Sequence, residues 1–192
     1  MACKSEFETI RTGTDVNLML KKSLEYYDKG DYAKAQSLME LVMPSIKGRP
    51  ELEEVSYKYG YTHYNLKSFV SASYYFKNFA LTFANSKYRE EAEYMSAYSE
   101  FLQSPNYKLD QENTAKAIEG FQYFVNNFPE SKRVKDCNRL IDELRKKQEK
   151  RHLKKENCIL NSKDTKLPFR FLKICLKTIP KRATQSASVF WF

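Results

Sequence analysis

The sequence predicts an all-α fold, a tetratricopeptide-repeat-like superhelix built from antiparallel pairs of helices. Two observations carry this prediction. The chain has 14 Tyr and 13 Phe but only 5 Gly and 6 Pro among its 192 residues, which favours helices with aromatic cores over a turn-rich β fold. In addition, small and large residues recur at the same offsets in three successive stretches. Such recurrence is typical of helical repeats, each of which buries its apolar face against its neighbours.

The first unit spans residues 15–47 and is predicted to form helices at about 15–29 and 32–46. Asp15 is a candidate N-cap, because its carboxylate can accept hydrogen bonds from the free amides of the first helical turn. Between the helices, Gly30 suits a tight turn, since glycine enters left-handed backbone conformations without steric cost. The apolar face of the first helix is expected to consist of Leu18, Leu20 and Leu24.

Each unit carries an alanine where its second helix presses on its first, so that a larger side chain would clash there. Apolar residues follow this alanine four, seven and eight positions later, and those at four and seven are large. The second unit covers residues 51–85, and Gly60 lies in its first helix, where a neighbouring helix must come close. The alanine spacing approaches the period of about 34 residues once insertions are allowed for. The residues predicted to pack the repeats are Tyr26, Gly30, Tyr32, Ala35, Gly60, Phe69, Ala72, Phe76, Ala117, Phe121 and Pro129.

The third unit covers residues 87–129, with an insertion at 104–114 between its helices. A fourth unit begins at residues 131–150 with an apolar stripe that runs from Val134 to Leu144, and no partner helix follows it. Terminal repeats need a polar outer face. We therefore expect this stripe to be exposed, with a lower stability and a tendency to aggregate as the consequences.

The net charge of +9 belongs to the C-terminal segment, because residues 151–192 hold ten Lys or Arg and only two acidic residues. The repeats are nearly neutral, so the sequence predicts no nucleic-acid partner. Residues 151–192 lack a sustained helical period, and a basic nucleic-acid tail or a membrane-surface segment are the functional alternatives. Permitted codons for this segment, read one nucleotide out of frame, can encode a further repeat with the same offsets. We interpret it as an aberrant basic tail produced by a frameshift near residue 150.

The predicted organisation therefore has three parts. Residues 1–14 form an N-terminal lipid-anchor segment and linker. Residues 15–150 form a helical repeat domain of about three and a half repeats. Residues 151–192 form the aberrant tail, disordered or poorly packed.

No constellation for catalysis or metal binding stands out, so we predict neither an enzyme nor a cofactor nor a metal site. His63 occupies the position of Tyr26 in its unit, with no second histidine among the repeats and no carboxylate at ligand spacing. It is therefore predicted to be a core residue. The chain contains no HExxH, P-loop or GxSxG motif. No pair of cysteines has the CxxC spacing of a metal or redox site, and the four are Cys3, Cys137, Cys158 and Cys175.

Cys3 follows the small residue Ala2. The lipid-accepting cysteine of a bacterial lipoprotein also follows a small residue, at the end of a signal that has a basic start and an apolar run. Only Met1 and Ala2 precede Cys3 in this sequence, and a buried or incidental thiol is the alternative to an acylation site.

Taken together, the repeats, the early cysteine and the insertion resemble the BamD (ComL, YfiO) family of outer-membrane assembly lipoproteins, in the form found in Bacteroidetes-like bacteria. The resemblance covers residues 1–150. It is carried by CKSEFE at 3–8, YYDKGDYAKAQ at 26–36, ASYYFKNFA at 72–80, SPNYKLDQENTAKAIEGFQYFVNNFP at 104–129 and CNRLIDELRKK from Cys137.

The resemblance implies a non-enzymatic, lipid-anchored scaffold on the periplasmic face of the outer membrane, within the machinery that assembles β-barrel proteins. It implies that Cys3 is acylated, that the N-terminal repeats meet unfolded barrel substrates, and that the C-terminal repeats bind the periplasmic domains of BamA. The alternative is a generic tetratricopeptide adaptor for protein–protein interactions, periplasmic or cytosolic, without a lipid anchor.

Overall fold

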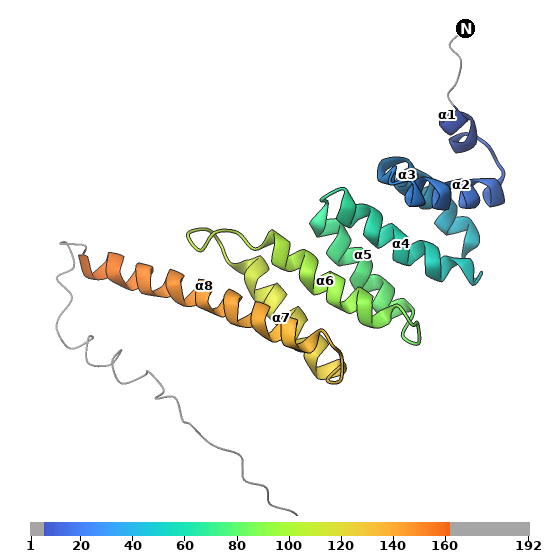
Figure 1. Ribbon diagram of the computed structural model, residues 1–192. Helices are drawn as coiled ribbons and strands as arrows, with labels where there is room; N and C mark the ends of the chain where they lie inside the picture. Colours follow the sequence, from blue (N-terminus) through green and yellow to red (C-terminus); the bar gives the residue numbers. More distant parts are fainter. Residues whose placement is uncertain (1–5, 162–192) are drawn as a thin grey trace, which may run out of the picture. The chain divides into compact units, whose positions relative to one another are not determined.

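The computed structural model describes the backbone of residues 6–161 and side chains as far as residue 154. Predictions for Cys3 and for the tail beyond residue 161 lie outside these residues. The described chain forms eight α-helices and one 3-10 helix, and no strand (Figure 1). Their bounds are α1 Glu6–Arg11, α2 Val16–Asp28, α3 Tyr32–Val42, η1 Met43–Ile46, α4 Glu51–Asn65, α5 Phe69–Thr82, α6 Arg89–Gln103, α7 Glu112–Asn127 and α8 Val134–Asn161.

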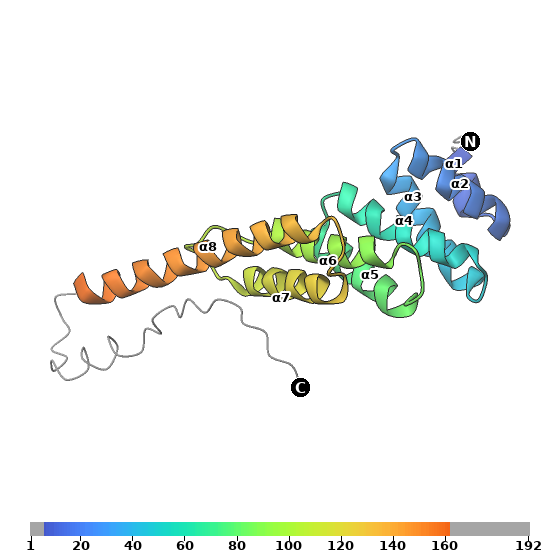
Figure 2. The same cartoon turned by 60° about the horizontal axis from the view of Figure 1, so that its bottom comes forward.

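The helices pack as consecutive antiparallel pairs, α2 with α3, α4 with α5, and α6 with α7 (Figures 1 and 2). The second helix of a pair also packs against the first helix of the next pair, as α5 does against α6. These helix pairs lie in one compact unit of the chain, which ends at His152. The arrangement confirms the predicted all-α class of packed helix pairs. Within the described residues, no helix combines the length and the apolar content that crossing a membrane requires.

A short helix, α1, precedes the first pair where the sequence predicted only an anchor segment and linker. Its Ile10 is buried with the core of the first pair, and Phe7 meets the ring of Tyr26 edge-on at 5.9 Å between centroids. The apolar residues of EFETIR thus add one more layer to the first repeat.

The predicted apolar face of α2 is wrong by one position at its start. Asp15 caps the helix as predicted, accepting hydrogen bonds from the amides of Asn17 and Leu18 at 3.0 and 3.1 Å. From this starting point the helical phase turns Met19 inward and leaves Leu18 43% exposed. Leu20 and Leu24 only flank the core, and a small residue, Ser23, takes the other buried position.

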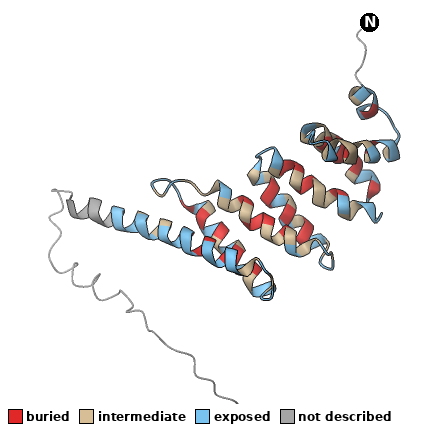
Figure 3. Ribbon diagram, viewed as in Figure 1, coloured by how far each residue is buried: buried red, intermediate tan, exposed pale blue. Residues whose placement is uncertain are grey.

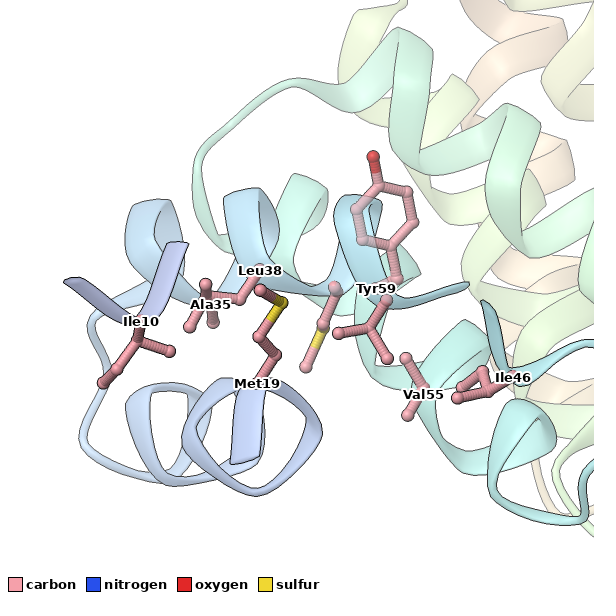
Figure 4. Packing of buried hydrophobic residues seen from close by; sticks show 9 residues of the cluster. Ile10, Met19, Ala35, Leu38, Ile46, Val55 and Tyr59 are labelled. Atoms are coloured by element: carbon pink, nitrogen blue, oxygen red, sulfur yellow. The ribbon is translucent and has the colours of Figure 1, made fainter. Parts of the chain in front are cut away.

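Three buried clusters follow one another along the chain, and each contains a small alanine from a second helix. Buried residues line the facing sides of the paired helices (Figure 3). Ala35, Ala72 and Ala117 are all 0% exposed. In the first cluster, Met19 of α2 points toward Ala35 and Leu38 of α3 (Figure 4). The short alanine side chain lets the two helices of a pair approach closely, which explains why this position recurs.

Two of the turns between paired helices share one hydrogen-bond pattern, although only one of them contains glycine. The amide of Asp31 donates to Tyr26 O, and the amide of Gly30 donates to Tyr27 O, as in a Schellman motif. Ser68 and Lys67 repeat both bonds after α4. The residue at the left-handed position has φ of 81° at Gly30 and 60° at Lys67. The lysine therefore holds a strained conformation that glycine adopts freely.

Replacing Lys67 with glycine is expected to raise the free energy of unfolding by about 1 kcal/mol, because it relieves this strain. Urea unfolding followed by circular dichroism would measure the change. The matched control is Gly30→Lys, which places the same side chain at the equivalent turn and is expected to lower the free energy of unfolding by a similar amount. A loss of stability in Lys67→Gly would contradict the assignment of strain to this turn.

The apolar stripe of the fourth unit is not exposed, so that prediction is wrong. Leu144 is 0% exposed, and the stripe packs on Ala117, Phe121 and Phe124 of α7. The first helix of a unit already has a partner in the preceding pair, because α8 meets α7 as α6 meets α5. The helix also continues to Asn161, past the boundary predicted at residue 150. As far as residue 154, where the description of its side chains ends, its buried residues are Cys137, Leu140, Ile141 and Leu144.

Candidate protein-binding surface

Six half-buried aromatic side chains share one face of two neighbouring first helices, α4 and α6. They follow the same spacing on both helices, since each set occupies positions i, i+4 and i+7. Residues at this spacing lie on one side of a helix. We call this set the aromatic face; its members are Tyr57, Tyr61 and Tyr64 of α4 with Tyr94, Tyr98 and Phe101 of α6.

The rings of the aromatic face contact one another along and between the helices. On α6, Tyr98 stacks between Tyr94 and Phe101, with centroids 5.7 Å away on both sides. On α4, the rings of Tyr57 and Tyr61 meet edge-on at 5.1 Å. Tyr64 and Tyr98 join the two helices at 6.5 Å. Aromatic pairs at these separations stabilise one another beyond the area that they bury.

Buried phenylalanines of the second helices pack against the inner side of the aromatic face. Phe76 of α5 lies 5.0 Å from the ring of Tyr61, and Phe121 of α7 lies 6.2 Å from the ring of Tyr94. Both phenylalanines are 0% exposed. Two of the residues predicted to pack the repeats, Phe76 and Phe121, thus lie against rings of the aromatic face.

A polar network crosses the aromatic face and reaches the turn before α8. The hydroxyl of Tyr61 donates to Glu91 Oε1 at 2.9 Å, and Glu91 pairs with Arg133. The guanidinium of Arg133 lies 4.3 Å from the centre of the Tyr94 ring, in a cation–π contact. Burial raises the pKa of Tyr61 well above its ordinary value, so its phenol stays protonated and donates. Burial likewise raises the pKa of Tyr57.

The insertion in the third unit is an ordered loop between α6 and α7, and its anchor is Gln111, which is buried. The side-chain amide of Gln111 donates to Asn106 O at 3.0 Å and to Leu109 O at 3.1 Å, and its oxygen accepts from Thr114. Two basic side chains of α8 reach the loop, because Lys147 donates to Ser104 Oγ at 2.8 Å and Lys150 lies over the ring of Tyr107. The part of α8 that extends beyond the core therefore contacts this loop and holds it in place.

His63 is a packed core residue where the first two repeats meet. Its ring stacks on Tyr75 of α5 at 4.7 Å and meets Tyr59 edge-on at 4.8 Å. The side-chain amide of Gln36 lies 3.2 Å from Nε2. Burial lowers the pKa of His63, with a smaller opposing effect from the charge of Glu40. No group of metal-ligating side chains occurs at His63 or elsewhere in the described part of the chain.

Acidification is expected to destabilise the protein through His63. A histidine whose pKa is lowered by folding binds fewer protons when folded, so stability is full above the unfolded pKa of about 6.5 and falls as the pH drops below it. Urea unfolding at pH 7.5 and pH 5.5 would show the loss. The control is His63→Phe, which keeps an aromatic ring and should reduce the difference between the two pH values. An equal difference in His63→Phe would contradict this role.

The remaining predicted packing residues occupy varied positions. Gly60 is buried on α4, and a Cβ there would lie 2.8 Å from Phe76 Cε1, so this is a point of close helix approach. Three aromatics are half-buried, namely Tyr26, Tyr32 and Phe69, whereas Pro129 is exposed in the turn after α7. Sequence reasoning did not identify the aromatic face, although its signal is present in the identical spacing on α4 and α6. No local pattern indicated the pairing of Glu91 with Arg133.

Comparison with known proteins places this helical array in a family. Residues 14–155 match the family model YfiO, described as outer membrane lipoprotein. The chain belongs to this family. A search among curated proteins finds no match. In this YfiO-family chain, the matched range contains the whole aromatic face, the ordered loop and the part of α8 that contacts the loop.

Proposed function

We propose that this protein is a non-enzymatic scaffold of the machinery that assembles β-barrel proteins in the outer membrane. In this proposal, its repeats bind unfolded barrel proteins and the periplasmic domains of a BamA-like partner. Membership of the YfiO outer membrane lipoprotein family supports the cellular role. The aromatic face is the single observation that supports binding, because six half-buried rings offer a prepared contact surface on adjacent helices.

The chemistry of the aromatic face suits an unfolded barrel segment. A membrane-spanning β-strand alternates apolar and polar residues over about 10 positions. Tyrosine contacts such a segment with a large flat ring at low entropic cost and can hydrogen-bond through its hydroxyl. The face is also rigid, since the rings rest on Phe76 and Phe121 and Arg133 braces Tyr94. A rigid surface avoids the cost of ordering side chains upon binding.

Binding to a labelled synthetic peptide with the sequence of one barrel strand would test the proposal. Fluorescence anisotropy of the peptide against the purified full chain gives the Kd. Tyr98→Ala is expected to raise the Kd about 10-fold, equivalent to about 1.4 kcal/mol. Tyr123→Ala is the matched control, because Tyr123 is an exposed tyrosine on α7, outside the aromatic face. No binding by the unaltered protein, or equal losses in both variants, would reject the aromatic face as the barrel site.

We further propose that Cys3 is acylated and holds the protein on the periplasmic face of the outer membrane. Labelling cells with radioactive palmitate is expected to mark the protein, and Cys3→Ser should abolish both the label and the sedimentation with membranes. An unlabelled protein that fractionates with soluble material would instead favour the adaptor without a lipid anchor.

A further inference from the structure

One second helix, α5, carries an exposed apolar ridge. Val70, Tyr74 and Leu81 are 72%, 61% and 69% exposed. At 3.6 residues per turn, these three side chains fall within about 40° of one another around the helix axis. The ridge lies opposite Ala72, which faces the core with 0% exposure. We call these three residues the α5 ridge.

The repeat fold does not require apolar residues at these positions. Counted from the buried alanine, Val70, Tyr74 and Leu81 lie two residues before it, two after it and nine after it. The same positions on and beside the other second helices carry alanine, proline or polar side chains instead. They are Ala33, Ser37 and Pro44 around α3, and Ala115, Glu119 and Asn126 on α7. The α5 ridge is therefore a property of this repeat alone, and packing within the described chain does not explain it.

The chain segment that carries the α5 ridge is basic and contains no acidic residue. From Val55 to Arg89 the chain contains four Lys and one Arg but no Asp or Glu. Lys67 is exposed in the turn before α5, and Lys77 is exposed between Tyr74 and Leu81 on the helix. Lys77 influences Glu100 of α6 through its charge but forms no ion pair with it. A partner that covers the ridge therefore meets apolar side chains bordered by positive charge.

We propose that the α5 ridge docks into an apolar groove on a second protein and that acidic side chains line the rim of this groove. Apolar anchors spaced along one helix face are typical of a helix bound in a groove, and Tyr74 at the centre is of the residue type that dominates binding energy. The positive charges of the lysines are complementary to an acidic rim and speed association with the partner. This site is separate from the aromatic face and does not depend on barrel binding.

Two other occupants fit the ridge less well. A helix that lies on a membrane has an apolar face about 100° wide or more, with many basic residues beside it, whereas this ridge spans about 40° and α5 contains a single lysine. In a symmetric contact between two copies, each copy would present the same surface, and this would bring Lys77 near the partner copy's lysines. Like charges at such a contact repel.

Photo-crosslinking in cells that make the full chain tests the proposal. Benzoylphenylalanine is placed singly at Val70, Tyr74 or Leu81, with Ser37 and Glu119 as matched control positions on α3 and α7. The expected result is one protein adduct shared by the three ridge positions and missing from both controls. Mass spectrometry should map the crosslink to an apolar groove with Asp or Glu at its rim. Lys67→Glu combined with Lys77→Glu should reduce the adduct at least 10-fold.

Several results would overturn the proposal. They are no adduct, an adduct of equal yield from the control positions, an adduct to lipid or to a second copy, and an adduct that is unaffected by charge reversal. Melting curves verify that the variants remain folded, which is expected because the substituted side chains are exposed. Binding of the barrel-strand peptide should be unchanged in Tyr74→Ser, so failure of the ridge proposal is distinguishable from failure of the barrel-binding proposal.

Discussion

Replacing Phe76 with alanine is expected to lower the free energy of unfolding by about 3–5 kcal/mol, the largest effect of any substitution considered for this chain. Phe76 is 0% exposed and contacts Tyr57 and Tyr61, so its removal leaves a cavity that fixed rings on α4 surround. Urea unfolding followed by circular dichroism measures the loss. Tyr74→Ala on the same helix is the control and should change stability by less than about 0.5 kcal/mol, because Tyr74 is exposed.

The contact between Phe76 and α4 can also be tested by a substitution on α4. Gly60→Ala would place a Cβ 2.8 Å from Phe76 Cε1, so it is expected to destabilise, although alanine favours a helix interior over glycine by about 1 kcal/mol. In a Phe76→Leu background the ring is gone, and the same substitution should cost less or become stabilising. Additive effects of the two changes would contradict a direct contact between Gly60 and Phe76.

Replacing Ala117 with leucine is expected to cost about 1–3 kcal/mol, the second large effect, because the added carbons have no space between α7 and its neighbours. Ala117 is 0% exposed and packs with Phe121 and Cys137. The control is Ala115→Leu, two residues earlier on α7, where the alanine is exposed and the same added volume meets solvent. Thermal unfolding of the two variants gives the comparison. Equal melting temperatures would reject close packing at the recurring alanine.

The class of fold was predictable because its signal repeats. An alanine with apolar residues at fixed offsets appears three times, and each such alanine lies fully buried in the structure. Features that occur only once in the sequence were less informative. The phase of α2 was wrong at Leu18, since one turn of helix contains too few residues to fix which of two adjacent apolar positions faces inward. α1 was missed because it is only six residues long.

The environment of α8 was not predictable from local pattern. Its apolar stripe indicated a need for a partner helix, and the sequence offered none after it. The structure supplies that partner from the preceding pair, through Phe121 and Phe124 of α7. Burial of a repeat depends on contacts between units, which the residues of one unit do not specify.

The candidate binding surface was partly present in the sequence. Tyr57, Tyr61 and Tyr64 share their spacing with Tyr94, Tyr98 and Phe101, and a comparison of the two helices reveals the shared face. The contacts of Glu91 and Arg133 with that face could not be predicted from the sequence. Arg133 lies far along the chain from Glu91 and Tyr94, and only the packing of successive first helices brings the three side chains together.

Core packing and the proposed function are linked through the same residues. Phe76 and Phe121 fill the interior of two repeats and also support the rings of the aromatic face. A substitution beneath the face therefore changes both stability and binding, whereas Tyr98→Ala removes an accessible ring and should act on binding with a smaller loss of stability. Substitutions that are meant to test binding are therefore best made at residues of the aromatic face.

The proposed role in barrel assembly is tested by the level of folded β-barrel proteins in the outer membrane when this protein is depleted from the cells that make it. Folded barrels are distinguished from unfolded ones by their migration in gels before and after heating. We predict that unfolded barrel proteins accumulate, and that the unaltered chain or Tyr123→Ala restores assembly while a combined Tyr64→Ala and Tyr98→Ala variant does not. Normal levels of folded barrel proteins after depletion would contradict this role.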